Sequence, residues 1–365
     1  MEEQIRRLKL WDEGKKKGPY FFRLFLTSRC NLKCKFCVYG SKKSEQFQEE
    51  LTLKEWIRII KEVSGLGCKR VDILGGEPFI RKYETIKIMS MLKEHNFSAS
   101  VTTNGTLLDS NMIHEIVKMD WDVIQISIDS PNKKIHDYYR GEKGTFNKAI
   151  KSLKLFNYWK NKLKKKKPSV VVASVLTNWN FLDLEEMVKL TYKYKANCFD
   201  ATPLFQDFPE VGKFQLNEEN NPKLLKSIKY ALKYVKEKKL FSNLQGLYEN
   251  FDVINEKDKF EKIKQKRISE KKIEFPICFE PWLTLKIDSG GWVTCCSSQS
   301  EKKFNIKNKD VRDLWYGKYF NKIRIRMLRK QPINACKHCC YNVYSTNMKL
   351  YENIKRREPN LLKIH

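Results

Sequence analysis

The stretch Tyr20-Phe-Phe-Arg-Leu-Phe-Leu-Thr-Ser-Arg-Cys30-Asn-Leu-Lys-Cys34-Lys-Phe-Cys37 decides the fold, because it joins an apolar segment to three closely spaced thiols. The aromatic and aliphatic run up to Leu26 predicts a buried strand. The three Cys follow on the loop that leaves this strand, with three and then two residues between them. Thiolates select soft metals, so this loop predicts zinc or an iron–sulfur cluster.

Three thiols are one short of a structural zinc site, which takes four ligands in a closed tetrahedron. A cluster of four irons held by Cys30, Cys34 and Cys37 keeps one iron open for a small molecule, and this is a catalytic arrangement. Six more of the eleven Cys form a second group late in the chain: Cys278, Cys295, Cys296, Cys336, Cys339 and Cys340. Cys68 and Cys198 stand apart in apolar surroundings, and we expect them to be small buried side chains.

The composition predicts a folded, cytoplasmic protein. Hydrophobic residues make up 41% of the 365 residues, and clustered Cys without a recognisable export signal indicate reduced thiols. The longest apolar run, Val170–Leu176 with its neighbours, is far shorter than the ~18 residues of a membrane span. The net charge of +29 comes mainly from Lys. No nucleic-acid-binding motif accompanies it, so we do not expect a nucleic acid as partner.

The first 240 residues alternate between short apolar runs and helical patterns. Strands are predicted at 21–26, 70–74, 97–102, 122–128, 169–176 and 198–202, and helices at 52–65, 83–95, 109–119, 145–164, 181–195 and 217–239. Thr52 and Glu55 form a capping-box pattern at the start of the first of these helices. Strands alternating with helices predict an α/β fold with a parallel sheet and right-handed crossovers.

Polar motifs follow the predicted strands in order. They are Gly75-Gly76-Glu77-Pro78, Asn104, Ser127 with Asp129, and Arg140-Gly141. Together with the Cys30-x3-Cys34-x2-Cys37 loop and Phe36 before its third Cys, the series over residues 20–240 resembles the radical S-adenosylmethionine (radical SAM) superfamily. The resemblance implies a partial (β/α)6 TIM-type barrel with its chemistry at the carboxyl ends of the strands. It also implies a [4Fe–4S] cluster on the three Cys, with S-adenosylmethionine bound to the open iron.

The same resemblance implies how S-adenosylmethionine is held. The segment Gly75–Pro78 would receive the methionyl amino group, with Glu77 as its acceptor. Polar groups suited to the ribose and the methionyl end are Asn104, Ser127 and Asp129. Arg140 would pair with the carboxylate through its two-pronged guanidinium. Adenine would face Tyr39 and the backbone of Val175 and Leu176, with Phe36 beside the cofactor.

Residues 277–345 predict a small α+β domain around the second Cys group. Strands at 283–287 and 292–296 flank Asp288-Ser-Gly-Gly291 and predict a hairpin, and a helix is predicted from Val311 to Arg329. The spacing of these Cys residues resembles that of the auxiliary-cluster domains called SPASM and twitch. The resemblance implies one cluster, bound by Cys278, either Cys295 or Cys296, Cys336 and Cys339. No Cys follows Cys340, so the one-cluster twitch type matches better, and the Gly-x4-Cys register slightly favours Cys296. Zinc is the alternative occupant.

The predicted organisation is a barrel at 1–240, a linker at 241–276, the auxiliary domain at 277–345 and a basic tail at 346–365. The auxiliary cluster offers an electron acceptor, which favours net oxidation. The leading hypothesis is a radical SAM oxidoreductase that cleaves S-adenosylmethionine to a 5′-deoxyadenosyl radical and oxidises a sugar-like or other small substrate. An external reductant such as flavodoxin or ferredoxin would supply electrons. Candidate catalytic residues are Asp288 and His338.

Two alternatives stay open at this point. The first is a peptide maturase that modifies a ribosomal peptide or a sulfatase. The short segment before the first strand offers little room for a fused peptide-binding domain, which favours a small substrate. The second alternative is a non-catalytic iron–sulfur protein that transfers electrons or binds RNA, and the Cys triad with Glu77 counts against it.

Overall fold

The computed structural model describes residues 1–37, 39, 49–204, 209–249, 277–296, 304–331, 333, 336, 339 and 341–362. Its strands form one sheet with the spatial order β7-β6-β5-β4-β3-β2-β1-β8-β9. Their bounds are β1 Phe21–Thr27, β2 Arg70–Gly75, β3 Ser98–Thr103, β4 Val123–Ser127, β5 Ser169–Leu176, β6 Cys198–Pro203, β7 Phe241–Ser242, β8 Thr284–Ile287 and β9 Val293–Thr294. Each neighbouring pair is parallel except β8 and β9.

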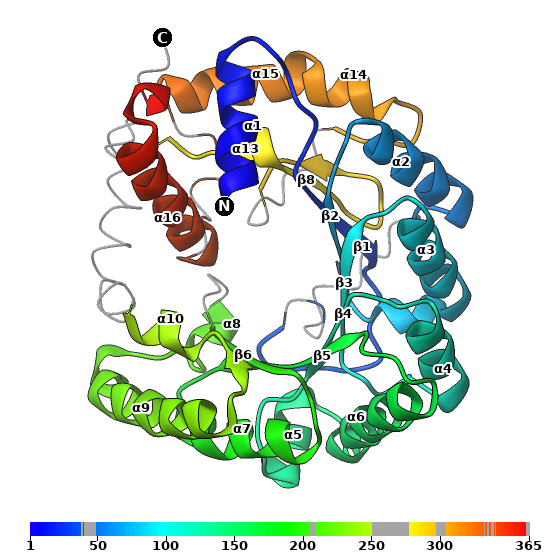
Figure 1. Cartoon of the computed structure of the whole chain (residues 1–365), viewed down its shortest axis with the longest axis vertical. Coiled ribbons are helices and arrows are strands. Elements are labelled where there is room, and N and C mark those ends of the chain that lie inside the picture. The colour runs from blue at the N-terminus through cyan, green and yellow to red at the C-terminus, as the bar shows by residue number, and fades with distance from the viewer. Residues whose placement is uncertain are drawn as a thin grey trace.

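A helix follows each of the first six strands and returns the chain to the start of the next. These are α2 Leu53–Gly65, α3 Lys82–Glu94, α4 Ser110–Lys118, α6 Thr145–Lys162, α7 Leu184–Lys193 and α9 Asn221–Lys238. Figure 1 shows the strands on the inside of a curved wall and these helices on its outside. The prediction of an α/β partial barrel is confirmed. The capping box is also present, since Thr52 Oγ1 accepts from the Glu55 amide at 3.2 Å and Glu55 accepts from the Thr52 amide at 2.7 Å.

Several helices were not predicted or were predicted differently. The N-terminal α1 (Glu2–Asp12) and the short α5 (Lys133–Arg140) were missed. The single helix predicted from Val311 to Arg329 was wrong, because α14 (Val311–Tyr316) and α15 (Lys318–Leu328) meet at Gly317 in an extended conformation. Further helical segments are α8 Pro209–Gly212, α10 Leu244–Glu249, α13 Glu280–Leu283 and α16 Tyr341–Arg357. The last of these runs across the predicted boundary between the auxiliary domain and the basic tail.

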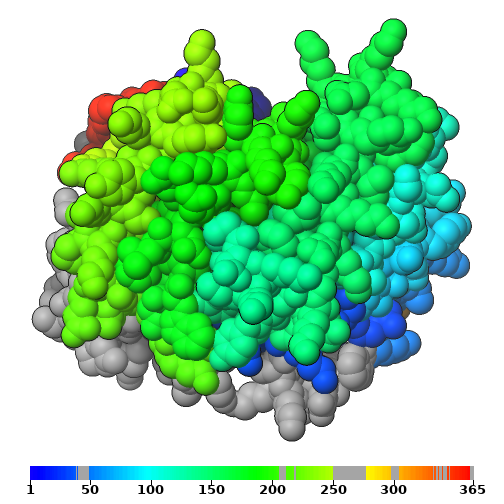
Figure 2. Space-filling view, turned by 90° about the horizontal axis from the view of Figure 1, so that it is seen from below, coloured from blue at the N-terminus to red at the C-terminus, as the bar shows by residue number. Residues whose placement is uncertain are grey.

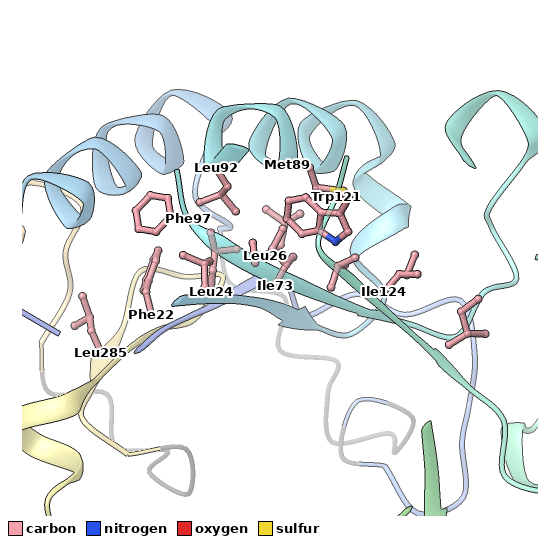
Figure 3. Close-up of a cluster of buried hydrophobic side chains, with 14 of the residues drawn as sticks. Phe22, Leu24, Leu26, Ile73, Met89, Leu92, Phe97, Trp121, Ile124 and Leu285 are labelled. Carbon is pink, nitrogen blue, oxygen red and sulfur yellow. The ribbon is translucent and has the colours of Figure 1, made fainter. Parts of the chain in front are cut away.

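The late segment of the chain joins the same sheet as the barrel. Strand β8 pairs in parallel with β1, so that Phe22 lies opposite Leu285, and β9 turns back on β8 as the predicted hairpin. In Figure 3 Leu285 lies beside Phe22, in a row of apolar side chains that continues along β1 through Leu24 and Leu26. Phe22 and Leu285 are fully buried. The chain segments that lead to the two Cys groups therefore join one continuous sheet.

The two faces of the sheet differ in polarity. Every second residue of β1 is buried against the helices, where Phe22, Leu24 and Leu26 pack with Trp121 and other large side chains (Figure 3). Since side chains alternate along a strand, the remaining positions face the inside of the wall, and they carry half-buried polar groups: Arg23, Asp72, Ser100, Gln125, Asp200 and Lys286. Arg23 lies between Asp72 and Lys286 in the strand register. The inner surface therefore carries charges of both signs, together with apolar side chains such as Phe25.

The described helices include none with the length and apolar character that a membrane crossing needs. Of the predicted linker at 241–276, the structure describes β7 and α10, and its residues 250–276 lie outside the described part.

Candidate functional site

The loop with Cys30, Cys34 and Cys37 leaves the carboxyl end of β1 and is held first by the end of β2. The amide of Gly76 donates to the Thr27 carbonyl at 2.8 Å, and the amide of Glu77 donates to the Arg29 carbonyl at 2.9 Å. A Cβ at Gly76 would lie 2.1 Å from the Arg29 carbonyl oxygen. Glycine is therefore required here so that the two backbones can approach. In this structure Gly76 makes room for the Cys loop.

The other side of the Cys loop rests on α5. The amide of Lys35 donates to the Tyr139 carbonyl at 2.9 Å. Gly141 ends α5 with φ at +72°, and a Cβ there would lie 2.3 Å from the carbonyl oxygen of Lys33. The loop is thus gripped between Gly76 and Gly141, two glycines that are far apart in sequence. This fixes the path of the backbone that carries the three thiols.

The three thiols of the loop differ in burial. Cys34 is buried, and Cys30 and Cys37 are half-buried. The Leu32 amide donates to the Cys30 sulfur at 3.4 Å. Burial raises the pKa of Cys30 to about 11 and that of Cys34 to about 12. Arg140, whose Nη1 lies 3.9 Å from the Cys34 sulfur, acts against this rise.

Arg140 and Asp129 form a buried ion pair beside the Cys loop. Arg140 Nη2 lies 2.7 Å from Asp129 Oδ2, and Asp129 Oδ1 accepts from the Val175 amide at 3.0 Å. Burial acts to lower the pKa of Arg140, but Asp129 and the thiols outweigh it and raise that pKa. The guanidinium also lies over the Phe36 ring at 5.6 Å. Within the described residues, buried Arg140 Nε has no hydrogen-bond partner.

Glu77 ties the loops after β2 and β3 together. Its Oε1 accepts from Thr103 Oγ1 at 2.7 Å and from the Phe79 amide at 3.1 Å, and its Oε2 accepts from the Asn104 amide at 2.7 Å. Burial raises the pKa of Glu77 and these bonds oppose the rise. Pro78, also buried, begins a short 3-10 turn. Three donors within the protein thus bind the Glu77 carboxylate, which the sequence analysis proposed as the acceptor for the amino group of S-adenosylmethionine.

The remaining predicted cofactor residues lie around the same strand ends. Asn104 Nδ2 donates to Asn31 Oδ1 on the Cys loop at 3.0 Å, and Ser127 is half-buried at the end of β4. The backbone carbonyls of Val175 and Leu176 already accept hydrogen bonds within the protein. Asn180 Nδ2 donates to the Val175 carbonyl at 2.9 Å, and the Leu204 amide donates to the Leu176 carbonyl at 2.9 Å. Tyr39 has a raised pKa through burial and through the nearby charges of Cys37 and Asp288.

Asp288 and Tyr39 connect the first site to the late segment. Asp288 Oδ1 accepts from the amides of Gly290 at 3.0 Å and Trp292 at 2.9 Å, so it shapes the hairpin turn. The same turn meets the end of the Cys loop, where the Leu51 amide donates to the Ser289 carbonyl at 2.6 Å. The other candidate catalytic residue, His338, lies outside the described residues, as does Cys340.

The second Cys group gathers thiols from three segments. Cys295 is buried in the main core, whereas Cys278, Cys296, Cys336 and Cys339 are half-buried. Burial raises the pKa of Cys278 and Cys296 well above the ordinary value, and the nearby charges of Glu280 and Cys339 add to both. Burial also raises the pKa of Cys295 to about 12. Cys296 therefore lies near Cys278 and Cys339, whereas Cys295 is a core residue that lies near Cys336.

Some residues near the site were missed by the sequence analysis. His136 is buried, and its Nδ1 accepts from the Asp129 amide at 3.2 Å. Burial and the charge of Arg140 lower its pKa to about 3. Burial also raises the pKa of Asp200 on the inner face of β6. Polar residues at inner positions of several strands, such as Arg23 in β1 and Asp72 in β2, were the signal for this inner face.

Comparison with known proteins agrees with this arrangement. Residues 24–191 match the radical SAM superfamily, and residues 278–340 match SPASM, an iron–sulfur cluster-binding domain. Residues 24–191 therefore form a radical SAM domain, and a SPASM domain follows it at residues 278–340. The radical SAM domain implies a [4Fe–4S] cluster and S-adenosylmethionine, and the SPASM domain implies auxiliary clusters.

Particular relatives match over part of their length. The chain is 32% identical to an Fe-coproporphyrin III synthase of Methanosarcina barkeri over 35% of this chain and 31% of that protein. It is 31% identical to a PqqA peptide cyclase of Granulibacter bethesdensis over 36% and 34% respectively. These alignments span about a third of the relatives' own length. The structure of Streptococcus suis SuiB bound to S-adenosylmethionine matches the fold with a TM-score of 0.65 at 19% identity, over 91% of this chain and 74% of SuiB.

The residues of the first site fit the group that the family implies. Three soft thiols stand on one loop, and a buried guanidinium beside them balances the negative charge that thiolates bring. Arg140 Nε is a buried donor without a partner in the described part of the chain. No three Cys, His, Asp or Glu side chains among the described residues are close enough to share one metal ion.

Proposed function

We propose that this chain oxidises its substrate by radical chemistry and passes an electron to an auxiliary cluster on the second Cys group. The observation that carries the proposal is the pairing of β8 with β1, which attaches the second group to the strand that bears the first. A substrate that has lost one hydrogen atom must lose one more electron to become an oxidised product. An auxiliary cluster attached to the same sheet would accept that electron.

In this proposal Cys30, Cys34 and Cys37 hold the [4Fe–4S] cluster, which together with bound S-adenosylmethionine supplies a carbon radical able to take a hydrogen atom. The buried Arg140 guanidinium stabilises the negative charge of the thiolates, and its partner Asp129 fixes its orientation. Glu77 positions the loop that meets the Cys segment. The remaining polar residues after β3 and β4, Asn104 and Ser127, lie where the ribose and methionyl groups would need partners.

The second group would bind one auxiliary cluster through Cys278, Cys296, Cys336 and Cys339. Cys296 is favoured over Cys295 because it is the half-buried member of the pair and lies near Cys278 and Cys339. Successive residues of an extended chain point in opposite directions, so both cannot face one cluster in the same way. Cys295 is then a core side chain behind the cluster.

A peptide side chain is the substrate that we propose first. The relatedness to a PqqA peptide cyclase supports this choice. The second candidate is a sugar-like or other small polar molecule, and the polar inner face with Arg23, Asp72 and Lys286 favours it. Both substrates would offer the C–H bond at the carboxyl ends of the strands, and both reactions are net oxidations.

The test changes one Cys of each group in turn and measures activity in protein loaded with iron and sulfide. Cys34→Ala should abolish release of 5′-deoxyadenosine with dithionite as reductant, and Cys336→Ala should keep that release but lose the oxidised product. Cys198→Ala, at the opposite end of the strands, is the matched control and should keep both. If Cys336→Ala formed product at the rate of the unaltered protein, the electron-acceptor role would be wrong.

The substrate class is tested by deuterium transfer. Candidate peptides and polyhydroxylated small molecules, uniformly deuterated, are incubated with loaded protein, and deuterium in 5′-deoxyadenosine is measured by mass spectrometry. Transfer from a peptide and not from the small molecules supports the first candidate, and the reverse supports the second. If protein with an intact first cluster released no 5′-deoxyadenosine at all, the result would support the alternative that the protein is a non-catalytic iron–sulfur protein.

A further inference from the structure

The Cys loop presents a basic outer surface. Along the loop, buried Leu32, Cys34 and Phe36 alternate with exposed Asn31, Lys33 and Lys35. The segment that buries Cys34 therefore exposes its lysines to solvent. Few residues separate this outer surface from the place where the first cluster is expected.

Two exposed aromatic rings lie next to these lysines. Tyr138 on α5 is 48% exposed and Trp179 after β5 is 52% exposed. Their rings stack with centroids 5.7 Å apart and an interplanar angle of 6°, and Lys35 Nζ lies 4.4 Å from the centre of the Tyr138 ring. Large aromatic side chains are enriched where proteins bind one another, and Tyr and Trp lose little conformational freedom on binding. This pair is therefore a preformed contact surface.

Behind the pair, a row of aromatic rings leads to the Cys loop. Buried Tyr139 has its ring centre 6.0 Å from that of Trp179 and 6.0 Å from that of Phe36. Phe36 directly precedes Cys37 in the chain. A continuous series of ring contacts therefore connects the exposed Trp179 with Phe36, the residue next to Cys37.

The charge around the rings has mostly one sign. Exposed Lys33, Lys35 and Lys134 lie on the Cys loop and on α5, Lys143 follows α5, and Lys213 lies 5.3 Å from the Phe214 ring, which in turn contacts Trp179. Glu142 is an exposed acidic residue in the same stretch. Figure 2 views this side of the molecule, where blue atoms of the early chain emerge at the lower edge beside the blue-green atoms that follow. The surface is complementary to an acidic partner.

We propose that Lys33, Lys35, Tyr138 and Trp179, here called the loop face, dock an acidic protein that carries a low-potential flavin or iron–sulfur centre. In the docked complex one electron leaves the partner's reduced centre and arrives at the cluster on the Cys loop. The partner is oxidised by one electron, the cluster is reduced by one, and no bond or proton changes hands. The proposal rests on the proposed function for the presence of that cluster.

The test compares a protein donor with a small one. The probe is a flavodoxin, an acidic flavoprotein, and the variants are Lys33→Glu with Lys35→Glu, and Trp179→Ala. The control is Lys54→Glu with Lys61→Glu, two exposed lysines on α2, which lies on a different side of the molecule (Figure 1). Binding of flavodoxin to loaded protein is measured at low and high salt, and reduction of the cluster is followed by stopped-flow absorbance.

The charge reversal on the loop face should weaken flavodoxin binding at least tenfold at low salt, and less at high salt, because salt screens exposed charges. Trp179→Ala should slow cluster reduction by flavodoxin severalfold. The control should change binding less than twofold. With dithionite, every variant should release 5′-deoxyadenosine within twofold of the unaltered protein, since a small reductant needs no docking surface.

Two results would overturn the docking proposal. One is unchanged flavodoxin binding after charge reversal of the loop face. The other is an equal loss of activity with dithionite, which would mean that the lysines support the cluster and not the partner. If no variant and no unaltered protein released 5′-deoxyadenosine, the proposed function would fail, but the flavodoxin-binding measurement would still decide whether the loop face docks an acidic protein.

Discussion

The two Cys groups are built in opposite ways. The first lies on one short loop, and two glycines far away in sequence, Gly76 and Gly141, hold that loop by backbone contacts. The second is drawn from three segments and depends on the pairing of β8 with β1 and on packing of Cys295 in the core. The first group is therefore local in sequence, and close backbone contacts fix its position. The second group forms only after distant segments of the chain have packed together.

The largest expected effect comes from adding a methyl group where the Cys loop is gripped. Gly141→Ala would place a Cβ 2.3 Å from the Lys33 carbonyl oxygen. A displacement of about 1 Å at a reacting group can cost about 100-fold in rate, so we expect at least that loss in 5′-deoxyadenosine release while the iron of the second group is kept. Iron analysis and the cleavage assay check this.

Gly144→Ala is the matched control for that substitution. Gly144 also has a positive φ, at +84°, but nothing lies within 4 Å of the position of its Cβ. It should carry the same backbone strain and keep most of the activity. Equal losses in the two variants would mean that strain, and not contact with the Cys loop, explains the effect.

The next prediction separates the neighbouring thiols of the second group. Cys296→Ser should lower the iron content from about eight to about four per chain, as expected for two cubane clusters reduced to one. Cys295→Ser should keep the iron and lower the stability, because it introduces a hydroxyl into a site that is 1% exposed. Iron analysis with thermal unfolding checks both, and the reverse pattern would make Cys295 the ligand.

A smaller effect concerns the dependence of stability on pH. The folded pKa of His136, about 3, lies below its ordinary value of 6.5. As the pH falls below 6.5 the unfolded chain takes up a proton that the folded chain does not, so stability is lost on acidification. Linkage gives about 2 kcal/mol between pH 7 and pH 5.

His136→Gln should remove this contribution, because an amide oxygen still accepts from Asp129 but does not titrate. Urea unfolding of iron-free protein at pH 7 and pH 5 measures the difference. An unchanged pH dependence in the variant would show that His136 is protonated in the folded protein.

The smallest predicted effect tests how the late segment is attached to the barrel. Arg58 on α2 donates to the carbonyls of Ile306 at 2.9 Å and Lys309 at 2.8 Å. Arg58→Ala should cost about 1 kcal/mol, the usual size of such exposed hydrogen bonds. Arg6→Ala, which loses only a pair with Glu3 inside α1, is the control and should cost less. Urea midpoints compare them.

Features that depend on residues close together in the chain could be predicted from the sequence. The six strands and their helices, the capping box at Thr52 and the hairpin after Leu283 all follow from patterns of a few residues. The Cys triad could be predicted for the same reason. The eight-residue α5 was missed because it is too short to show a clear period, although it carries Arg140.

The rest depended on contacts between distant residues. The pairing of Arg140 with Asp129 at 2.7 Å was not predicted, although a buried cation needs such a partner. The hydrogen bonds that Glu77 accepts from Thr103 and Asn104 were not predicted either. The β8–β1 pairing could not be predicted, because strand register between remote segments leaves no local pattern.

That pairing also has a consequence for synthesis. Strand β1 emerges from the ribosome early, yet its neighbour β8 is made about 260 residues later. Until then one edge of β1 has open backbone donors and acceptors, and an open strand edge invites pairing with other chains. The nascent protein must therefore wait, with its first thiols already made, until β8 has been made before β1 is paired on both edges, and slow translation or early release would favour aggregation at this edge.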